Sequence, residues 1–329
     1  MQGPYFEDLE VGQVFADAPG LTLTEGHAAL HQAITGDRLR LALDGPLCEA
    51  VTGERRILAH PNLVCDVAIG QSTGPTQRVR GNLFYRGLVL LAPVFIGDTL
   101  STRTEITGLK QNRNDTGLVA LRITTENQRS EPVLDFWRCP MIPLRDAGAA
   151  TGHADRFDDI PEELELDRVR AAVPGGWDLG ALGRRGDDAE CFAELEAGTV
   201  YAIEGRDTVT SAPELARLTL NLARAHTDAG GSVHGRRLVY GGHTISIAAA
   251  HATRALPGLA TFLAWRRCDH TGPVFEGDVL STELSIEGVH ALASSAGRLA
   301  DLRAVVHAER EGAGDPSPVL DWRFVGLMG

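Results

Sequence analysis

The stretch PVFIGDTLST, at residues 93–102, returns with two changes as PVFEGDVLST at residues 273–282. Two further pairs of segments keep the same order along the chain: FEDLEVGQVF at 6–15 matches FAELEAGTVY at 192–201, and VLDFW at 133–137 matches VLDWR at 319–323. The three pairs are offset by 180 or 186 residues. Matches in one order at nearly one offset indicate two copies of the same fold within the chain.

Each copy predicts the same order of elements. An amphipathic helix comes first, at residues 25–35 and 212–226, and an Ala-rich buried helix follows, near residues 62–70 and 242–255. Alternation of apolar and polar residues then predicts half-buried antiparallel strands, at 100–106, 119–128 and 133–140 in the first copy and at 280–286, 300–309 and 319–325 in the second. The sequence therefore predicts an α+β fold in which a long buried helix is followed by an antiparallel sheet, twice over.

The two copies set the predicted domain boundaries. We assign residues 1–145 to the first copy and residues 189–329 to the second. Residues 146–188 are rich in Gly, Pro, Asp and Arg, and we interpret them as a linker with one short acidic helix around residues 162–172. Such a linker lets the second copy return beside the first.

Composition limits the class of protein. The chain has 329 residues, 43% of them hydrophobic and 23% charged, as in soluble globular proteins. A net charge of -13 argues against nucleic acid and against an anionic membrane surface as partners. No apolar run approaches the roughly 20 residues of a membrane span, the first residues MQGPYFEDLEVG lack the apolar core of a signal peptide, and the five cysteines are scattered. We expect a cytoplasmic protein with reduced cysteines.

Residues able to move protons gather in the second copy, between residues 219 and 251. They are Asn221, His226 and Asp228, followed by Tyr240, Gly241 and Gly242 at the start of the Ala-rich helix. The first N–H groups of a helix have no partner within the helix, so they can bind an oxygen that carries negative charge. This combination indicates a site that holds a carbonyl oxygen while a proton is transferred beside it.

Several phrases resemble the MaoC-like acyl-CoA hydratase/dehydratase family: YFEDLEVG at 5–12, TGD at 35–37 and PVFIGDTL at 93–100. The resemblance covers both copies, and within the family the chain looks most similar to the mesaconyl-CoA hydratase (β-methylmalyl-CoA dehydratase) branch. It implies a double hotdog fold. It also implies reversible hydration of a 2-enoyl-CoA, or dehydration of a 3-hydroxyacyl-CoA, with a short branched or dicarboxylic acyl group. The CoA thioester is the substrate, no metal or redox cofactor is required, and the chain is a monomer (a pseudo-dimer of its two copies) or a homodimer.

The family's motif is an Asp followed five residues later by a His, which together hold one water, with a glycine N–H at the next helix start that polarises the thioester carbonyl. The first copy has the Asp as Asp37, but Ala42 stands at the His position and Pro61 at the glycine position. Proline has no N–H to donate. We therefore predict that the first copy is non-catalytic and forms a wall of the acyl pocket, with Asp37 in a turn or helix cap.

In the second copy His226 matches the His of the motif, whereas Asn221 replaces its Asp. An amide can hold a water but cannot take its proton. By the resemblance, His226 is then the acid/base, Asn221 and Asp228 position the water, and Gly241 or Gly242 binds the thioester oxygen. Asp228 also suits an ordinary turn, and both glycines also suit close helix packing.

Three further residues are candidates for substrate binding: Tyr240, His243 and His60. Each has a plainer interpretation, Tyr240 as a wall aromatic and the two histidines as buried, hydrogen-bonded core residues. The histidines of the chain do not form a metal-binding pattern.

Two other functions remain open. A hotdog thioesterase would direct water at the carbonyl carbon and usually needs a carboxylate near the helix start, for which Asp66 in the first copy is the helical candidate. A non-catalytic acyl-CoA-binding protein is favoured by both departures from the motif, Ala42 and Asn221.

Overall fold

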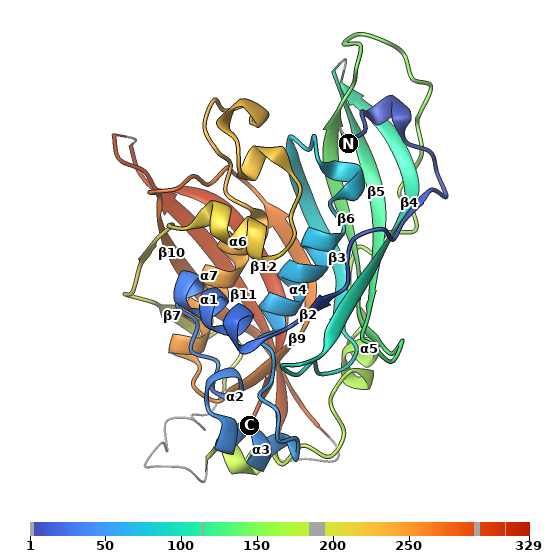
Figure 1. Ribbon diagram of the computed structural model, residues 1–329. Coiled ribbons are helices and arrows are strands. Elements are labelled where there is room, and N and C mark those ends of the chain that lie inside the picture. Colours follow the sequence, from blue (N-terminus) through green and yellow to red (C-terminus); the bar gives the residue numbers. More distant parts are fainter. Residues whose placement is uncertain (1–2, 114, 184–194, 293–296, 313) are drawn as a thin grey trace.

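The computed structural model describes residues 3–113, 115–183, 195–292, 297–312 and 314–329 (Figure 1). The first part of the chain contains η1(Phe6–Asp8), β1(Val14–Phe15), β2(Leu21–Thr22), α1(Glu25–Thr35), α2(Arg40–Leu43), α3(Gly45–Thr52), α4(Pro61–Gln71), η2(Gly74–Thr76), β3(Gly81–Leu90), β4(Thr99–Arg113), β5(Thr116–Glu126) and β6(Pro132–Pro143). The segment between the copies contains α5(Leu166–Ala171) and η3(Leu179–Leu182). The last part contains β7(Val200–Ala202), β8(Asp207–Thr208), α6(Ala212–Leu218), η5(Arg224–His226), η6(Ala229–Gly231), α7(Gly241–Ala255), β9(Leu259–His270), β10(Val279–Ala291), β11(Arg298–Glu309) and β12(Ser317–Met328).

The long strands form one continuous antiparallel sheet. Its order, β1-β4-β5-β6-β3-β9-β12-β11-β10-β7, reads the same from each end once the two copies are exchanged. The two halves join along β3 and β9, where Tyr85 pairs with Cys268 and Leu88 with Trp265. The internal repeat of the sequence is therefore a repeat in space, with the seam between β3 and β9 at its centre.

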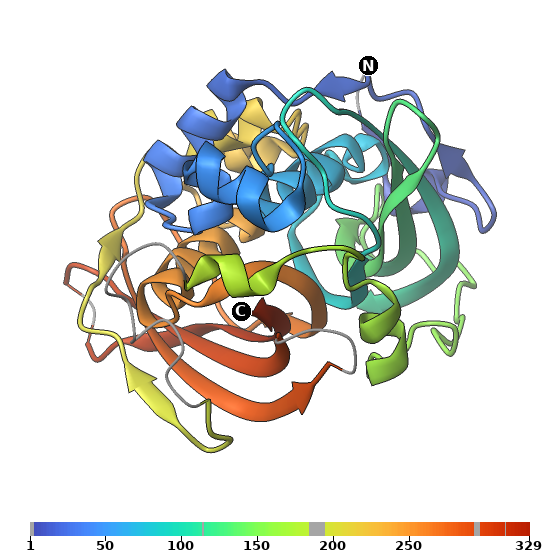
Figure 2. The same cartoon turned by 90° about the horizontal axis from the view of Figure 1, so that it is seen from below.

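The two Ala-rich helices lie inside the curve of this sheet (Figures 1 and 2). Every residue of α4 is buried, and α7 is buried from Gly242 to Thr253. Small residues let the helices and the loops above them approach closely. A Cβ on Gly242 would lie 2.0 Å from an Asp66 carboxylate oxygen on α4, so these two helices touch at that glycine. Each helix thus supplies the core of its own half and the contact to the other.

Most predicted elements are confirmed, with two differences. The helix predicted at residues 25–35 is α1. The predicted strands are longer than expected, although β5 ends at Glu126, two residues before its predicted end. The helix predicted at 212–226 is wrong beyond Leu218, because Leu220 adopts a left-handed conformation with φ +60° that ends the helix and turns the chain. Strands β3 and β9 were not predicted. β9 is buried over most of its length and β3 is buried from Gly87 to Leu90, so neither shows the alternation by which the other strands were recognised.

The segment between the copies packs on the protein as far as it is described. Ala154 forms a bridge with Lys110 of β4, and the side chains of Leu164, Leu179 and Leu182 are buried. These contacts mean that residues 146–183 are more than a tether. The remainder of the predicted linker, its boundary with the second copy at residues 188 and 189, and Cys191 lie outside the described residues.

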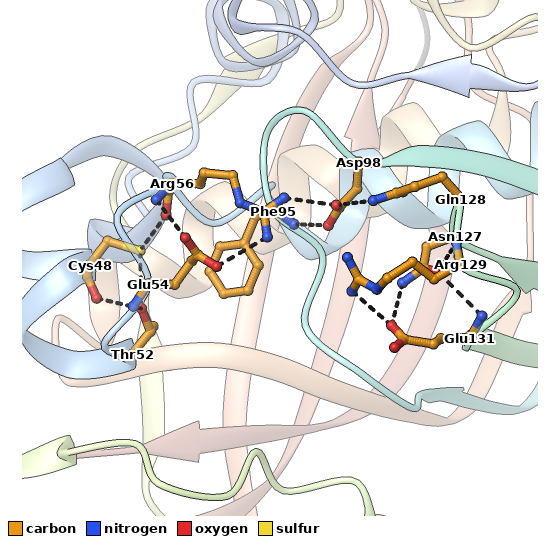
Figure 3. A network of polar contacts seen from close by, with 10 residues as sticks. All are labelled: Cys48, Thr52, Glu54, Arg56, Phe95, Asp98, Asn127, Gln128, Arg129 and Glu131. Carbon is orange, nitrogen blue, oxygen red and sulfur yellow. Dashed lines mark hydrogen bonds and ion pairs between the residues drawn. The ribbon is translucent and has the colours of Figure 1, made fainter.

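The repeated phrases at residues 93–102 and 273–282 form the same turn in both copies. In the first copy, Asp98 accepts hydrogen bonds from the Phe95 backbone N–H at 2.9 Å and from the side chains of Arg56 and Gln128, each at 2.8 Å (Figure 3). In the second copy, Asp278 accepts a hydrogen bond from the Phe275 N–H at 2.9 Å and two from an arginine, Arg310. A buried carboxylate that closes this turn explains why the phrase is retained twice.

We expect Asp98→Asn to lower the free energy of unfolding by about 1–3 kcal/mol at neutral pH, since it weakens three charge-assisted hydrogen bonds to a buried group. Burial raises the pKa of Asp98, but the Phe95, Gln128 and Arg56 contacts outweigh burial and leave that pKa below its ordinary value. The contribution is therefore present above the ordinary Asp pKa of about 3.9 and lost as the pH falls through the lower folded value.

Urea denaturation at neutral pH and at pH about 3 measures both effects. Asp278→Asn serves as the matched variant in the other copy and is expected to lose a similar amount of stability at neutral pH, because it also weakens three hydrogen bonds to a buried carboxylate. A change below about 0.5 kcal/mol in Asp98→Asn at neutral pH would contradict the role given to this turn.

Within the described ranges, each helix is too short or too polar to cross a lipid bilayer.

Candidate functional site

A cavity of about 230 Å³ lies where the two copies meet, beside the start of α7. The second copy contributes residues of the loop before α7 and of β9, and the first copy contributes residues of α4, β3 and β6. Its polar lining residues are Thr73, Thr76, Arg80, Asn82, Tyr85, Arg138, Asn221, His226, His234, Tyr240, Thr244, His270 and Thr271. None of the described residues that line this cavity is Asp or Glu.

His226 is held in one tautomer. Its side chain lines the cavity, and Nδ1 lies 2.8 Å from the Leu238 carbonyl oxygen. A carbonyl only accepts, so the proton of the neutral ring sits on Nδ1 and Nε2 is the nitrogen able to take a proton. Burial lowers the pKa of His226, the Leu238 contact opposes that effect, and the charge of Arg138 adds to it. The imidazole is therefore a neutral base at physiological pH.

The break after α6 brings Asn221 into the cavity that His226 also lines. The left-handed Leu220 turns the chain, and the Asn221 Oδ1 then accepts a hydrogen bond from the Ala223 N–H at 2.9 Å. With its oxygen so engaged, the Asn221 amide nitrogen is the group left to donate a hydrogen bond to a bound molecule. Asn221 is buried and lines the cavity.

The start of α7 differs from that of α4 in a way that matters for binding an oxygen. Tyr240 precedes α7 and provides no side-chain cap. At α4, by contrast, the first residue is Pro61, and the His60 Nδ1 accepts a hydrogen bond from the Asn62 N–H at 3.1 Å. The first copy therefore closes its helix start with its own residues, whereas the second leaves N–H groups available.

The two glycines at this helix start have different surroundings. Gly241 lines the cavity and lies next to His270. A Cβ on Gly241 would lie 2.6 Å from the His270 Nε2. Gly242 faces Asp66 of α4 and does not line the cavity. Of the two predicted donors, Gly241 is the one that the cavity contains, and Gly242 has the packing role that was its alternative.

Tyr240 also lines the cavity, which agrees with its interpretation as an aromatic residue of the cavity wall. Its ring lies 5.7 Å from the His226 ring, and its hydroxyl lies 3.5 Å from the Asp66 carbonyl oxygen, to which it donates a long hydrogen bond. Burial raises the pKa of Tyr240 well above its ordinary value, so the phenol keeps its proton.

Asp228 is not where the sequence analysis placed it. Its side chain is exposed and accepts a hydrogen bond from the Gly230 N–H at 2.9 Å, which caps η6. The His226 Nδ1 is bonded to Leu238 rather than to this carboxylate. Asp228 does not line the cavity, so its position does not support the prediction that it positions the water, and the turn that it opens is its structural role.

His243 is buried inside α7, and neither ring nitrogen has a hydrogen-bond partner among the described residues. Burial lowers the pKa of His243 to about 4, so the ring is neutral. It does not line the cavity, and the prediction that it contacts substrate there is not supported by its position.

His60 lines a different cavity, of about 300 Å³, in the first copy. There its Nε2 lies 3.0 Å from an Asp37 oxygen, and the ring of His31 lies 5.5 Å away. Asp37 also accepts a hydrogen bond from the Leu39 N–H at 2.6 Å, in keeping with the predicted turn. Burial raises the pKa of Asp37, but the contacts with His60 and the Leu39 N–H and the charge of His31 together outweigh burial and leave that pKa lowered. The candidate carboxylate Asp66 is buried, paired with His31 at 3.3 Å.

The residues of the cavity beside α7 that the sequence did not predict include Tyr85 on β3, Arg138 on β6 and His270 on β9. Tyr85 and His270 belong to strands that were not predicted. Arg138 left a signal that was not used, since the alternation of β6 directs residue 138 inward together with Phe136. Burial lowers the pKa of His270 to about 4, so this second histidine of the cavity is neutral.

Among the described residues, no group of three or more His, Cys, Asp or Glu side chains is placed to hold a metal ion.

Comparison with known proteins gives consistent results. The family model for mesaconyl-CoA hydratase matches residues 1–263. The chain is 30% identical to the β-methylmalyl-CoA dehydratase of Chloroflexus aurantiacus, over 99% of this chain and 97% of that protein. It is 29% identical to the mesaconyl-CoA hydratase of Cereibacter sphaeroides, over 84% of this chain and 81% of that protein.

Solved structures give the fold. A protein of Mycobacterium tuberculosis, described as having a double hotdog fold, is 48% identical, covers 99% of both chains and superposes with a TM-score of 0.89. A MaoC domain dehydratase of Chloroflexus aurantiacus is 28% identical, with a TM-score of 0.85 over 99% of this chain and 97% of that one. The sheet that wraps α4 and α7 is thus a double hotdog.

Proposed function

The chain belongs to the mesaconyl-CoA hydratase family, and we infer that it is a lyase that adds water to a 2-enoyl-CoA, or removes it from a 3-hydroxyacyl-CoA, with a short branched acyl group. The substrate is a CoA thioester. We place the reaction in the cavity beside α7. One observation supports this placement. His226, a neutral histidine with an available Nε2, lines the same cavity as Gly241, which stands at the uncapped start of a buried helix.

The steps of hydration follow from these groups. His226 takes a proton from water through Nε2 as the water oxygen adds to Cβ of the enoyl group. The Asn221 amide nitrogen donates a hydrogen bond that positions the water. The Gly241 N–H donates to the thioester oxygen, on which negative charge develops as the double bond is lost. The proton held by His226 then passes to Cα on the same face, so one H and one OH are added and His226 is neutral again.

We propose no metal or redox cofactor for this reaction. Addition of water to an enoyl thioester forms a C–O bond and transfers protons, with no net oxidation or reduction. The double bond is already polarised by the conjugated thioester. The groups needed are a base, a donor to the carbonyl and a positioned water, and the cavity has a candidate for each.

The first experiment is hydration of mesaconyl-CoA and crotonyl-CoA, followed as loss of the enoyl-thioester absorbance band. Release of free thiol is measured in parallel. Loss of the band without thiol supports the proposed hydratase. Thiol release would assign a thioesterase instead, and tight binding of either ester with no turnover would assign a binding protein in which Asn221 has replaced the catalytic Asp.

The pH dependence of hydration is a separate prediction. Because burial lowers the pKa of His226, the base remains neutral below the ordinary His value of about 6.5. We expect kcat/KM to be constant around neutral pH and to fall as the pH drops below that value, since protonated His226 cannot accept the proton of water. A pH profile with crotonyl-CoA measures this, because that substrate has no carboxylate of its own to titrate. A fall in kcat/KM centred at or above the ordinary His pKa would contradict the assignment of His226 as the base.

A further inference from the structure

Arg138 occupies an unusual position for a charged residue. It lies on β6 with 3% of its surface exposed, points inward and lines the cavity that contains His226 and Tyr240. At the offset of 186 residues that relates the two copies here, its counterpart on β12 is Phe324, which is fully buried. The fold therefore accepts an apolar side chain at this position, so the charge of Arg138 is not required for folding and calls for a different explanation.

The guanidinium of Arg138 has few partners. Its Nη2 donates to the Ser72 carbonyl oxygen at 2.7 Å and to the Thr76 hydroxyl at 3.1 Å. Its Nε has no hydrogen-bond partner among the described residues. Arg138 also forms no ion pair with any carboxylate of the described residues. Burial lowers the pKa of Arg138, yet arginine stays protonated in proteins, so a buried charge remains uncompensated.

Other arginines with little exposure show the contrast. Arg266 pairs with Asp301 at 2.7 Å, and Arg86 pairs with Asp269 at 2.6 Å. Buried arginines are normally paired in this way, because an isolated buried charge is strongly destabilising. Since the described lining of the cavity holds no Asp or Glu, the anion that would complete Arg138 has to come from the bound molecule.

An acyl-CoA offers two sources of negative charge. One is the phosphates of CoA, and the other is a carboxylate at the far end of the acyl group. A cavity of about 230 Å³ has room for a short acyl chain rather than for a nucleotide, and Arg138 at 3% exposure is not a surface contact for phosphate. Guanidinium also matches the flat, two-oxygen geometry of a carboxylate. The acyl carboxylate is the better fit.

We propose that Arg138 binds the free carboxylate of a dicarboxylic acyl-CoA and selects such esters over monocarboxylic ones of similar length. This inference rests on the proposed function and deepens it, because it names the residue that sets the acyl class. The two contacts of Nη2 with Ser72 and Thr76 fix the guanidinium in place, so its other N–H groups are oriented before the substrate arrives.

The test compares kcat/KM for mesaconyl-CoA, which ends in a carboxylate, with kcat/KM for crotonyl-CoA, which does not. We expect Arg138→Gln to lose 100-fold or more on mesaconyl-CoA, mainly through KM, and to stay within about threefold on crotonyl-CoA. Arg138→Lys keeps the charge but lacks the paired N–H groups of the guanidinium. Its kcat/KM for mesaconyl-CoA is expected to lie between those of wild type and Arg138→Gln. Equal losses on both substrates, or no loss on mesaconyl-CoA, would overturn the proposal.

Arg122→Gln is the matched control, since Arg122 lies on the neighbouring strand β5, is half exposed and pairs with Asp135 outside the cavity. It is expected to change both substrates little and alike. Thermal melting of each variant shows whether it folds.

Binding to the wild-type protein gives a second measurement that needs neither turnover nor a variant. We expect succinyl-CoA to bind at least tenfold more tightly than butyryl-CoA, whose acyl group has the same number of carbons and no carboxylate. Equal affinities would reject the role of Arg138. If neither enoyl ester is hydrated but succinyl-CoA is preferred, the hydratase function fails while the carboxylate site stands, so the two proposals fail separately.

Discussion

His226→Ala is expected to lower kcat/KM for enoyl-CoA hydration by about 100-fold to 10,000-fold, the usual contribution of a positioned acid/base. The reason is structural: Nδ1 is committed to Leu238, and Nε2 is the group proposed to take the proton of water. The other histidines and tyrosines among the described residues that line the cavity are His234, which is exposed, a neutral His270, and two tyrosines with raised pKa values. Absorbance of the enoyl thioester in wild type and variant measures the loss.

The matched control lies in the first copy. Asp37→Asn removes the carboxylate that stands at the family's Asp position and pairs with His60 at 3.0 Å, in the cavity on the other side. We expect this variant to keep hydration within about tenfold of wild type, provided that melting shows a folded protein. The reverse pattern, with activity lost in Asp37→Asn and kept in His226→Ala, would move the reaction to the first copy.

Gly70→Ala is expected to have the largest effect on the fold. A Cβ on Gly70 would lie 1.7 Å from the Thr219 carbonyl oxygen and 2.7 Å from its carbon, which are backbone atoms that cannot rotate away. Separation of α4 from this loop is expected to lower the free energy of unfolding by about 1–3 kcal/mol or more. Because Asn221 and His226 follow Thr219 on the same loop, hydration is expected to fall as well.

Urea denaturation measures the stability of Gly70→Ala, and the enoyl absorbance measures its activity. Gly175→Ala is the control, since a Cβ there has no neighbour within 4 Å. An alanine at residue 70 that leaves both stability and activity unchanged would show that the close approach of α4 and the 219–226 loop is not required.

The sequence predicted the parts of the fold that leave a periodic signal. Amphipathic α1 and the alternating strands were recognised. Strand β9, buried along most of its length, and β3, buried in its second half, were not. The seam between the copies was missed for that reason. The end of α6 was placed too late because the left-handed turn at Leu220 has no signal in residue type, as leucine rarely adopts it.

For the candidate site, the motif led to the residues that lie close together along the chain. Asn221, His226, Tyr240 and Gly241 all line one cavity. Asp228 was misplaced, because the same residue type serves a catalytic contact and a turn, and spacing alone does not separate them. Tyr85, Arg138 and His270 reach the cavity from three strands, and their proximity depends on the order of strands in the sheet, which no local pattern encodes.

The joining of two copies in one chain has an evolutionary consequence. In a dimer of identical chains, every substitution appears in both symmetry-related cavities, so a change that improves one site alters the other in the same way. Here the related positions have diverged: Arg138 against Phe324, Gly241 against Pro61, and His226 against Ala42. One half is thereby free to specialise in binding and shaping while the other keeps the proton chemistry, and a single cavity can be made asymmetric enough to tell the two ends of its ligand apart.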